Sequence, residues 1–182
     1  IRRRSQEPGR IGFRRAPRRA REKPQQMRHL MIPRYGPPPR PASRIGHGWR
    51  RRPGAYAILI RDGWLLLTHQ QAPVPEFQLP GGGIDPGESP VRALHREVGE
   101  ETGWTIAGPR FLSAYRRFAY MPDHDLHAEK LCEIWLARPI RRLGPPSEPG
   151  HSAHWVRPAV AADLLADPGA RAVLSRWLKA HG

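Results

Sequence analysis

An α/β fold, in which one sheet carries helices on both faces, is what the sequence predicts for residues 53–182. Short apolar runs of strand length alternate there with helix signals, and acidic and basic residues are equal in number, 14 of each. Residues 1–52 differ, because they hold 17 Lys and Arg against two acids and so supply the whole net charge of +15. The contrast predicts two parts, an N-terminal tail and one globular domain.

The tail, residues 1–52, combines runs of arginine with three consecutive prolines and shows neither strand nor helix periodicity. Such a segment buries too little apolar surface to offset its ordering entropy, so we expect it to be disordered. Any contact with nucleic acid would come through this basic tail. Because the chain begins with Ile1, and Met27 and Met31 precede the change in composition, we expect part or all of residues 1–30 to lie upstream of the native start.

The strands of the domain are predicted from short apolar runs bounded by turn residues. A tight turn at residues 61–63 joins the first two strands. The expected strands are residues 55–60, 64–69, 110–118, 131–137 and 153–156. The run from Pro80 to Gly83 is expected to break all regular structure. Since no apolar run approaches the roughly 18 residues of a membrane span, and the single cysteine, Cys132, forms no intramolecular disulfide, we expect a cytoplasmic protein.

A helix over residues 90–102 is predicted by signals at both ends. Ser89 is a favourable N-cap, Pro90 suits the first helical position, and Gly103 suits the left-handed residue past the end. Two further helices are expected at residues 159–165 and 169–180. The sequence thus places one helix in the middle of the domain and two at its C-terminal end.

One face of the middle helix is acidic. Glu97, Glu100 and Glu101 are neighbours, because residues three and four positions apart share a helix surface. Their carboxylates repel one another, most of all near the negative C-terminal end of the helix dipole. A divalent cation would relieve this repulsion, and carboxylate oxygens are the ligands that Mg²⁺ prefers. The alternative interpretation of such a charge run is a solvated acidic helix end.

The segment ahead of this helix favours the metal site. Gly81, Gly82 and Gly83 would let the backbone approach a phosphate group closely. Gly82, followed after five residues by Glu88 and after seven more by Arg96, opens a run that ends at Trp104. The whole run resembles the Nudix box, G-x5-E-x7-R-E-U-x-E-E-x-G-U, where U is a bulky apolar residue. Trp104 is the one soft departure, which we expect to affect packing more than chemistry.

The resemblance implies a Nudix-type α/β/α sandwich with a mixed β-sheet. It also implies Mg²⁺ or Mn²⁺ as cofactor, with Glu97 and Glu101 as the main ligands and Glu100 as a further ligand or second acceptor. The backbone carbonyl of Gly82 is a further candidate ligand. Arg96 would orient the glutamates through charge-assisted hydrogen bonds, and we expect Glu88 to fix the loop against the helix. The implied catalytic set therefore includes Arg96, Glu100 and Glu101.

Nudix enzymes usually add a carboxylate from outside the box. The candidates here are Asp123, Asp125, Glu129 and Glu133. Glu129 is the predicted catalytic residue, because a proline-containing loop that ends in Glu before an apolar strand resembles the pattern in Nudix enzymes acting on ADP-ribose and nucleotide sugars. The loop here is about two residues longer than in that pattern.

The implied activity is metal-dependent hydrolysis of a P–O–P bond in a nucleoside diphosphate derivative. ADP-ribose or a nucleotide sugar is placed ahead of dinucleoside polyphosphates, nucleoside triphosphates and capped RNA. The three glycines and Tyr120 are the predicted substrate contacts, and some of Tyr115, Phe118 and Trp135 could also stack on a base. The alternatives are a non-catalytic nucleotide sensor of the same fold and a nucleic-acid-binding protein acting through the tail. A homodimer is common in the family.

Overall fold

The computed structural model describes residues 49–121 and 126–181. Most of the predicted tail, and the candidates Asp123 and Asp125, lie outside the described residues. The elements are β1 (Arg50–Arg61), β2 (Trp64–Gln70), β3 (Glu76–Gln78), β4 (Gly81–Gly83), α1 (Pro90–Thr102), β5 (Trp104–Met121), β6 (Leu126–Arg142), β7 (His151–Val156), α2 (Pro158–Leu164) and α3 (Pro168–His181). In this part of the chain no helix is both long and apolar enough to cross a membrane.

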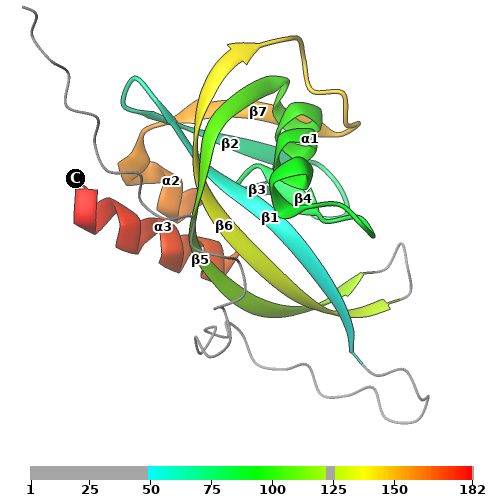
Figure 1. The fold of residues 1–182 in the computed structure, drawn as a ribbon. Helices are drawn as coiled ribbons and strands as arrows, with labels where there is room; N and C mark the ends of the chain where they lie inside the picture. Colours follow the sequence, from blue (N-terminus) through cyan, green and yellow to red (C-terminus); the bar gives the residue numbers. More distant parts are fainter. Residues whose placement is uncertain (1–48, 122–125, 182) are drawn as a thin grey trace, which may run out of the picture. The chain divides into compact units, whose positions relative to one another are not determined.

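The strands form one seven-stranded sheet with the order β3-β2-β1-β6-β5, to which β4 adds by pairing with β1 and β7 by pairing with β2. β1 and β6 run parallel, whereas the other pairs are antiparallel, so the sheet is mixed. α1 lies on one face, and α2 and α3 lie on the other (Figure 1). The predicted α/β/α sandwich with a mixed sheet is confirmed.

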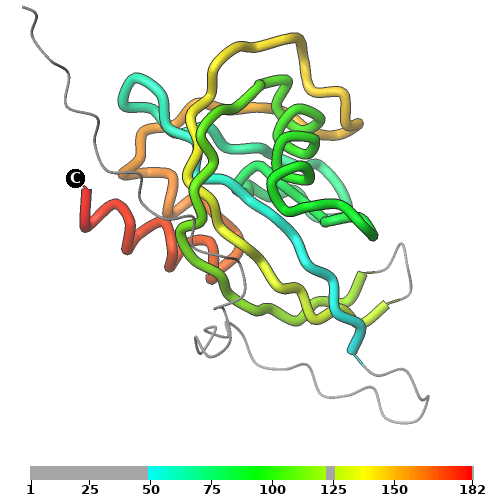
Figure 2. Tube along the Cα trace, viewed as in Figure 1, coloured from blue at the N-terminus to red at the C-terminus, as the bar shows by residue number. Residues whose placement is uncertain are grey.

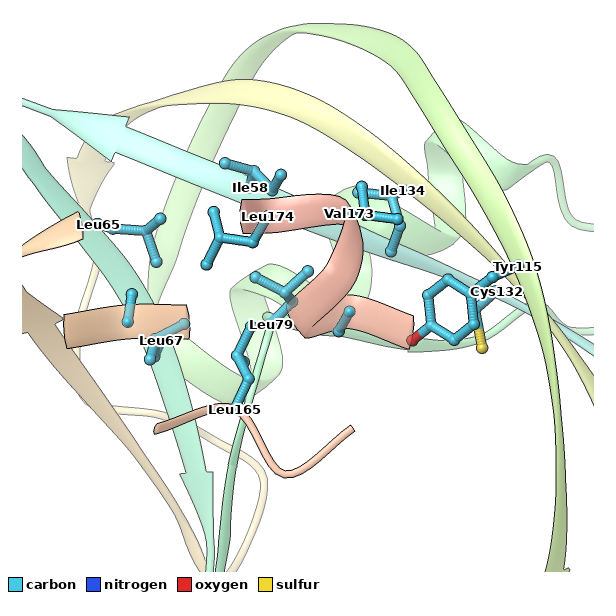
Figure 3. Packing of buried hydrophobic residues seen from close by; sticks show 12 residues of the cluster. Ile58, Leu65, Leu67, Leu79, Tyr115, Cys132, Ile134, Leu165, Val173 and Leu174 are labelled. Atoms are coloured by element: carbon cyan, nitrogen blue, oxygen red, sulfur yellow. The ribbon is translucent and has the colours of Figure 1, made fainter. Parts of the chain in front are cut away.

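Alternation along β1 divides the core between the two faces. Ala55, Ala57 and Leu59 pack with Leu94 and Val98 of α1, while the intervening Ile58 lies in the cluster beneath α2 and α3 (Figure 3). Successive strand residues point to opposite faces, so a strand buried on both sides is apolar throughout. The α1 side of β1 is lined by small residues, which lets the acidic helix lie close to the sheet.

The prediction that residues 80–83 break all regular structure is wrong, because Gly81–Gly83 forms β4. This short strand pairs with β1, where Gly81 lies opposite Tyr56 and Gly82 opposite Ala55. Gly81 has a φ of 136°, and a Cβ atom there would lie 2.2 Å from the Ala55 carbonyl oxygen. Only glycine allows so close an approach. The glycines that would end an ordinary strand therefore fasten this segment to β1 directly beside α1.

Several strands are longer than their apolar runs predict. β5 and β6 extend to 18 and 17 residues, and β1 begins at Arg50, three residues ahead of the predicted domain start. The parallel ladder between β1 and β6 already includes Arg50, opposite Ala128, and Arg51, opposite Glu129. Charged side chains at the end of the β1–β6 ladder do not disturb its backbone hydrogen bonds. They interrupt the apolar pattern, however, so this part of the strand is not predicted from the sequence.

The ends of α1 agree with the sequence prediction. The Ser89 hydroxyl accepts a hydrogen bond from the backbone N–H of Arg92 at 3.3 Å. Gly103 ends the helix with a φ of 72°, and its N–H donates to the Gly99 carbonyl at 2.8 Å. Both caps satisfy backbone groups that a helix end leaves without partners. α2 and α3 begin and end within one residue of the predicted positions.

α3 is fixed to the sheet by an ion pair whose carboxylate is buried. Asp167 accepts hydrogen bonds from Arg117 of β5 and, at 2.8 Å, from the backbone N–H of Ala170. Its side chain is 9% exposed. Burial alone would raise the pKa of Asp167, but the charge and hydrogen bond of Arg117, with the Ala170 N–H, hold this pKa below its ordinary value. The pair therefore stabilises the folded state in its ionised form.

We expect Asp167→Ala to lower the free energy of unfolding by about 2 kcal/mol near neutral pH, because the substitution removes the partner of the partly exposed Arg117 guanidinium and a helix cap. The folded-state pKa of Asp167 is lowered, so this stabilisation is present above the unfolded-state pKa and is lost as pH falls through the folded-state pKa, roughly from pH 5 to 2. Urea unfolding across that range measures it, with the exposed Asp163→Ala of α2 as the matched control. A difference from wild type that stays constant with pH would contradict the assignment.

Candidate active site

Arg96 of α1 holds several acidic groups together. Its Nε and Nη2 donate to the two carboxylate oxygens of Glu88 at 3.2 and 2.8 Å. Its Nη1 donates to Glu97 at 2.7 Å and to Glu100 at 3.3 Å, and Nη2 also reaches the Gly83 carbonyl at 3.0 Å. The hydrogen bonds that Arg96 donates to Glu88 and Glu97 raise the pKa of Arg96, although partial burial opposes them. One guanidinium thus ties the loop before α1 to two carboxylates of the helix.

Glu97 lies against the backbone of β4. A Cβ atom added to Gly82 would be 2.4 Å from Oε2 of Glu97. The Glu97 side chain is 12% exposed, and burial raises its pKa even though the Arg96 hydrogen bond and charge lower it. The Gly82 carbonyl oxygen lies 2.8 Å from the position that a Cβ would take on Gly54 of β1. Gly82 therefore provides the space in which Glu97 lies, and its carbonyl faces β1.

Glu101 is the most deeply buried carboxylate of the helix, with a side chain 6% exposed. Its Oε2 accepts a hydrogen bond from the Gly81 N–H at 2.9 Å. Burial raises the pKa of Glu101 well above its ordinary value, and the charges of Glu148, Glu97 and Glu100 raise it further, against the Gly81 hydrogen bond. A buried carboxylate surrounded by like charges is costly unless a cation compensates it. The residues present therefore fit a divalent metal.

Two further residues join Glu101 from the other side. The segment 143–150, between β6 and β7, runs beside the C-terminal end of α1 (Figure 2), where the N–H groups of Ser147 and Glu148 donate to the Glu100 carbonyl at 2.8 and 3.0 Å. His151 follows at the start of β7. Donor atoms of Glu101, Glu148 and His151 all lie within 4.8 Å of one another, and no other such group occurs in residues 49–121 and 126–181.

Neither Glu148 nor His151 was predicted from the sequence. The segment 143–150 is rich in proline and glycine and has no periodicity. A single Glu in such a segment and a single His just after it form no sequence motif that predicts a site. These residues become neighbours of the box only because β2 brings β7 alongside α1 and because the Glu100 carbonyl anchors the loop.

Glu129 lies between two arginines. Its carboxylate accepts a hydrogen bond from Arg116 Nη1 at 3.2 Å and lies 3.6 Å from Arg51 Nε. Glu129 pairs with Arg51 of β1, whereas Gly82 pairs with Ala55. Arg51 and Ala55 are four residues apart on β1, so Glu129 lies roughly 13 Å along the strand from Gly82. The catalytic role predicted for Glu129 stays a prediction, and its present partners neutralise its charge.

Glu133 lies closer than Glu129 to the glycines of β4, measured along β1. It lies opposite Ala55 in the ladder between β1 and β6, and Gly82 lies opposite the same residue on the other side. Cross-strand neighbours project from the same face, so Glu133 projects toward the side covered by α1. Burial raises its pKa. Glu133 is therefore half-buried near the acidic helix but outside the group formed by Glu101.

Tyr120 belongs to an aromatic group at the open ends of β1, β5 and β6. The ring of Tyr120, which is 51% exposed, lies 5.1 Å from that of His127. Trp49 lies edge-on to Phe118 at 4.8 Å and to His127 at 5.3 Å. The other two predicted stacking residues lie elsewhere, since Tyr115 is in the core beneath α3 and Trp135 packs beside the α1-side cluster.

Trp104, the soft departure from the box, has a packing role. Its ring lies 5.4 Å from that of Trp155, edge to face, and the Arg61 guanidinium lies 5.3 Å from the Trp104 ring centre. Trp104, Trp155 and Arg61 line a cavity of about 520 Å³ together with Asp62 and Trp64. No carboxylate of the box lines this cavity, so we do not assign it to the phosphate chemistry.

The spacing of the box and the arrangement of its carboxylates are matched by a known family. A sequence model described as NUDIX domain matches residues 50–178. The chain belongs to the Nudix family. A solved MutT NUDIX hydrolase from Burkholderia pseudomallei superposes with a TM-score of 0.53 at 27% identity, over 69% of this chain and 97% of that one.

Curated Nudix relatives differ in their named substrates. A CMP-5′-(N-acetyl-N-hydroxy-3-aminopropyl)phosphonate hydrolase of Streptomyces rubellomurinus is 31% identical over 128 residues, 66% of this chain and 59% of that protein. An RNA pyrophosphohydrolase of Cereibacter sphaeroides is 38% identical over 89 residues, 46% of this chain and 51% of that protein. The chain thus spans about half to three-fifths of the length of these relatives.

The close approach of Gly82 to Glu97 can be tested with two neighbouring glycines. We expect Gly82→Ala to displace the Glu97 carboxylate and to weaken Mn²⁺ binding by roughly tenfold or more, because ligands must be held within about 0.5 Å of their working positions. A Cβ on Gly83 meets nothing within 4 Å, so Gly83→Ala is the matched control. Titration of Mn²⁺ by calorimetry measures both, and equal affinities for the two variants would refute the steric argument.

Proposed function

We propose that this Nudix chain is a metal-dependent hydrolase that cleaves a P–O–P bond in a nucleoside diphosphate derivative. The observation that supports this most directly is the buried Glu101 carboxylate, whose pKa is raised by burial and by three neighbouring glutamates. A bound divalent ion would neutralise charge on the diphosphate and lower the pKa of a water molecule. Mg²⁺ or Mn²⁺ suits oxygen ligands of this kind.

The proposed roles follow from the contacts. Glu97 and Glu101 are the main metal ligands, and Glu100 is a further ligand or an acceptor beside them. The Gly82 carbonyl, which faces β1, stays a predicted ligand. Arg96 is a positioning residue, because its hydrogen bonds orient Glu97 and Glu100 and keep two carboxylates of one helix turn from repelling each other.

The carboxylate from outside the box is, in this proposal, Glu148. It lies within 4.8 Å of Glu101 and His151, and its backbone is fixed by a hydrogen bond to the Glu100 carbonyl. In the reaction, the oxygen of a water molecule bonds to one phosphorus, the bridging oxygen leaves with the other phosphate, and the released proton passes to a base. Glu148 is the proposed acceptor of that proton, and Glu129 is the alternative.

Substrate choice is the finer part of the proposal. The glycines of β4 offer a close backbone approach to phosphate, and Tyr120 with Trp49 offers ring faces for a base. The preference for ADP-ribose or a nucleotide sugar rests on Glu129, whereas relatives are named for RNA and for a CMP derivative. A base-bearing diphosphate is common to all of these, so one substrate panel decides among them.

The enzymatic proposal predicts that the full chain releases phosphate or a nucleoside monophosphate from one member of a panel of ADP-ribose, nucleotide sugars, dinucleoside polyphosphates, nucleoside triphosphates and capped RNA. We expect Glu101→Gln to lower kcat by a factor on the order of 10² or more, because it removes a charged ligand from a buried site. Asp163→Asn, at an exposed carboxylate of α2, is the control. If nothing turns over while a nucleotide raises Tm, the chain is a nucleotide sensor.

The two candidates for the proton acceptor can be separated by matched substitutions. We expect Glu148→Gln to lower kcat by roughly 10² or more with little change in Tm, and Glu129→Gln to change kcat by less than about threefold. Steady-state kinetics on the substrate identified by the panel measures both. The opposite order would return the catalytic role to Glu129.

The remaining expectations stay predictions. Nucleic-acid binding through the basic tail concerns residues outside the described part of the chain, and deletion of residues 1–48 with RNA binding across a salt series tests it. The cytoplasmic location rests on the single cysteine, Cys132, which is buried and whose pKa burial raises to about 11. A homodimer rests on the family resemblance alone.

A further inference from the structure

We infer that Glu101 and His151 form a mixed nitrogen and oxygen site for a divalent transition ion such as Mn²⁺, in which Nε2 of the His151 imidazole is a direct ligand and Glu148 lies beside the other ring nitrogen. This inference rests on the proposed metal dependence and goes beyond it, because it assigns an additional ligand and a preference among ions. His151 lies outside the box, and nothing in the sequence pattern assigns it to the site.

The distances among these residues suit a shared ion better than direct hydrogen bonds. Nε2 of His151 lies 3.6 Å from Oε1 of Glu101, and Nδ1 lies 3.8 Å from Oε1 of Glu148. Both separations exceed the 2.7 to 3.2 Å typical of N–H···O bonds. Two ligand atoms that each lie about 2.1 Å from one ion are roughly 3 to 3.5 Å apart. Small side-chain movements therefore bring the Glu101 and His151 donors onto one ion.

Burial makes the absence of hydrogen bonds significant. The side chains of Glu101 and His151 are 6% and 12% exposed. Nδ1 of His151 is buried and has no hydrogen-bond partner among the described residues, and Glu101 has its Gly81 hydrogen bond on Oε2 only. Buried polar atoms are nearly always satisfied in folded proteins. A metal ion on Nε2 would face Oε1 of Glu101, and Nδ1 would then point to Glu148, 3.8 Å away, where a carboxylate orients a metal-bound histidine.

The backbone holds these ligands in place without help from an ion. His151 begins β7, opposite Gln70 of β2, and its N–H donates to the Glu148 carbonyl at 3.3 Å. Gln71 donates to the Gly150 carbonyl at 3.0 Å, and Glu148 is tied to Glu100. Three elements, α1, β2 and the 143–150 loop, therefore fix the positions of the donors. Such preorganisation is what a tight metal site requires.

Arg96 binds two carboxylates of the acidic helix but not Glu101. Glu97 and Glu100 accept hydrogen bonds from Arg96, whereas Glu101 lies toward Gly81 and His151. Glu97 and Glu100 offer oxygen ligands alone, which suit Mg²⁺. His151 adds an imidazole beside Glu101, which favours transition ions over Mg²⁺. A site that takes its ligands from Glu97, Glu101 and His151 would therefore prefer Mn²⁺ to Mg²⁺.

The test is electron spin-echo spectroscopy of Mn²⁺ added to the untagged full chain. We expect modulation from a directly coordinated imidazole nitrogen in the wild type, its loss in His151→Gln, and a Mn²⁺ affinity roughly 10- to 100-fold weaker in that variant. His154→Gln, an exposed histidine three residues further along β7, should keep both the modulation and the affinity. Circular dichroism and Tm of each variant verify that it is folded.

The outcomes distinguish this inference from the proposed function. Mn²⁺ binding and turnover without nitrogen modulation, or modulation that persists in His151→Gln, would overturn the ligand assignment and leave the hydrolase intact. Absence of both Mn²⁺ binding and turnover would overturn both proposals. A wild-type affinity for Mg²⁺ equal to that for Mn²⁺, unchanged in His151→Gln, would also reject the mixed site.

Discussion

Three carboxylates within one turn of α1 repel one another, and the rest of the site is arranged around that repulsion. Arg96 offsets part of it by bonding Glu97 and Glu100. Within residues 49–121 and 126–181, no Lys or Arg side chain donates a hydrogen bond to Glu101, and burial raises the pKa of this carboxyl group. The dipole of α1 increases the repulsion, because the C-terminal end of a helix is negative. In the proposed enzyme, a bound divalent ion would supply the missing positive charge.

The sheet places backbone groups of β4, and not side chains, next to the acidic turn of α1. β4 pairs with β1 so that the Gly81 N–H reaches Glu101 and the Gly82 backbone leaves room for Glu97. The small residues of β1 let α1 lie close enough for this contact. A side chain on Gly82 would occupy the space of the Glu97 carboxylate, and one on Gly81 would clash with the Ala55 carbonyl. Glycine is needed here because it has no side chain. The absence of side chains also lowers the strand propensity of the segment, so sequence criteria do not predict a strand there.

The sequence was informative where interactions are local and uninformative where they are not. The caps of α1, the box and the α/β/α class follow from residues close together in the chain, and the structure confirms the fold and the helix. β4 was missed because its pairing depends on Gly54 and Ala55, which lie far from it in the chain. Glu148 and His151 were missed because a lone Glu or His in a loop is unremarkable until tertiary contacts bring it to Glu101.

The 143–150 loop is anchored mainly by backbone hydrogen bonds. This explains why the Nudix box predicts the type of reaction but not the identity of the substrate. The loop is held through main-chain groups, as when Ser147 and Glu148 donate to the Glu100 carbonyl, and main-chain bonds are available to any residue except proline. Apart from Glu148, its side chains can therefore differ while the loop keeps its place beside Glu100 and Glu101. The aromatic group of Trp49 and Tyr120 lies at the other end of the same strands. The aromatic group can therefore change independently of the carboxylates of α1, whereas Glu148 of the loop cannot, because its charge acts on Glu101.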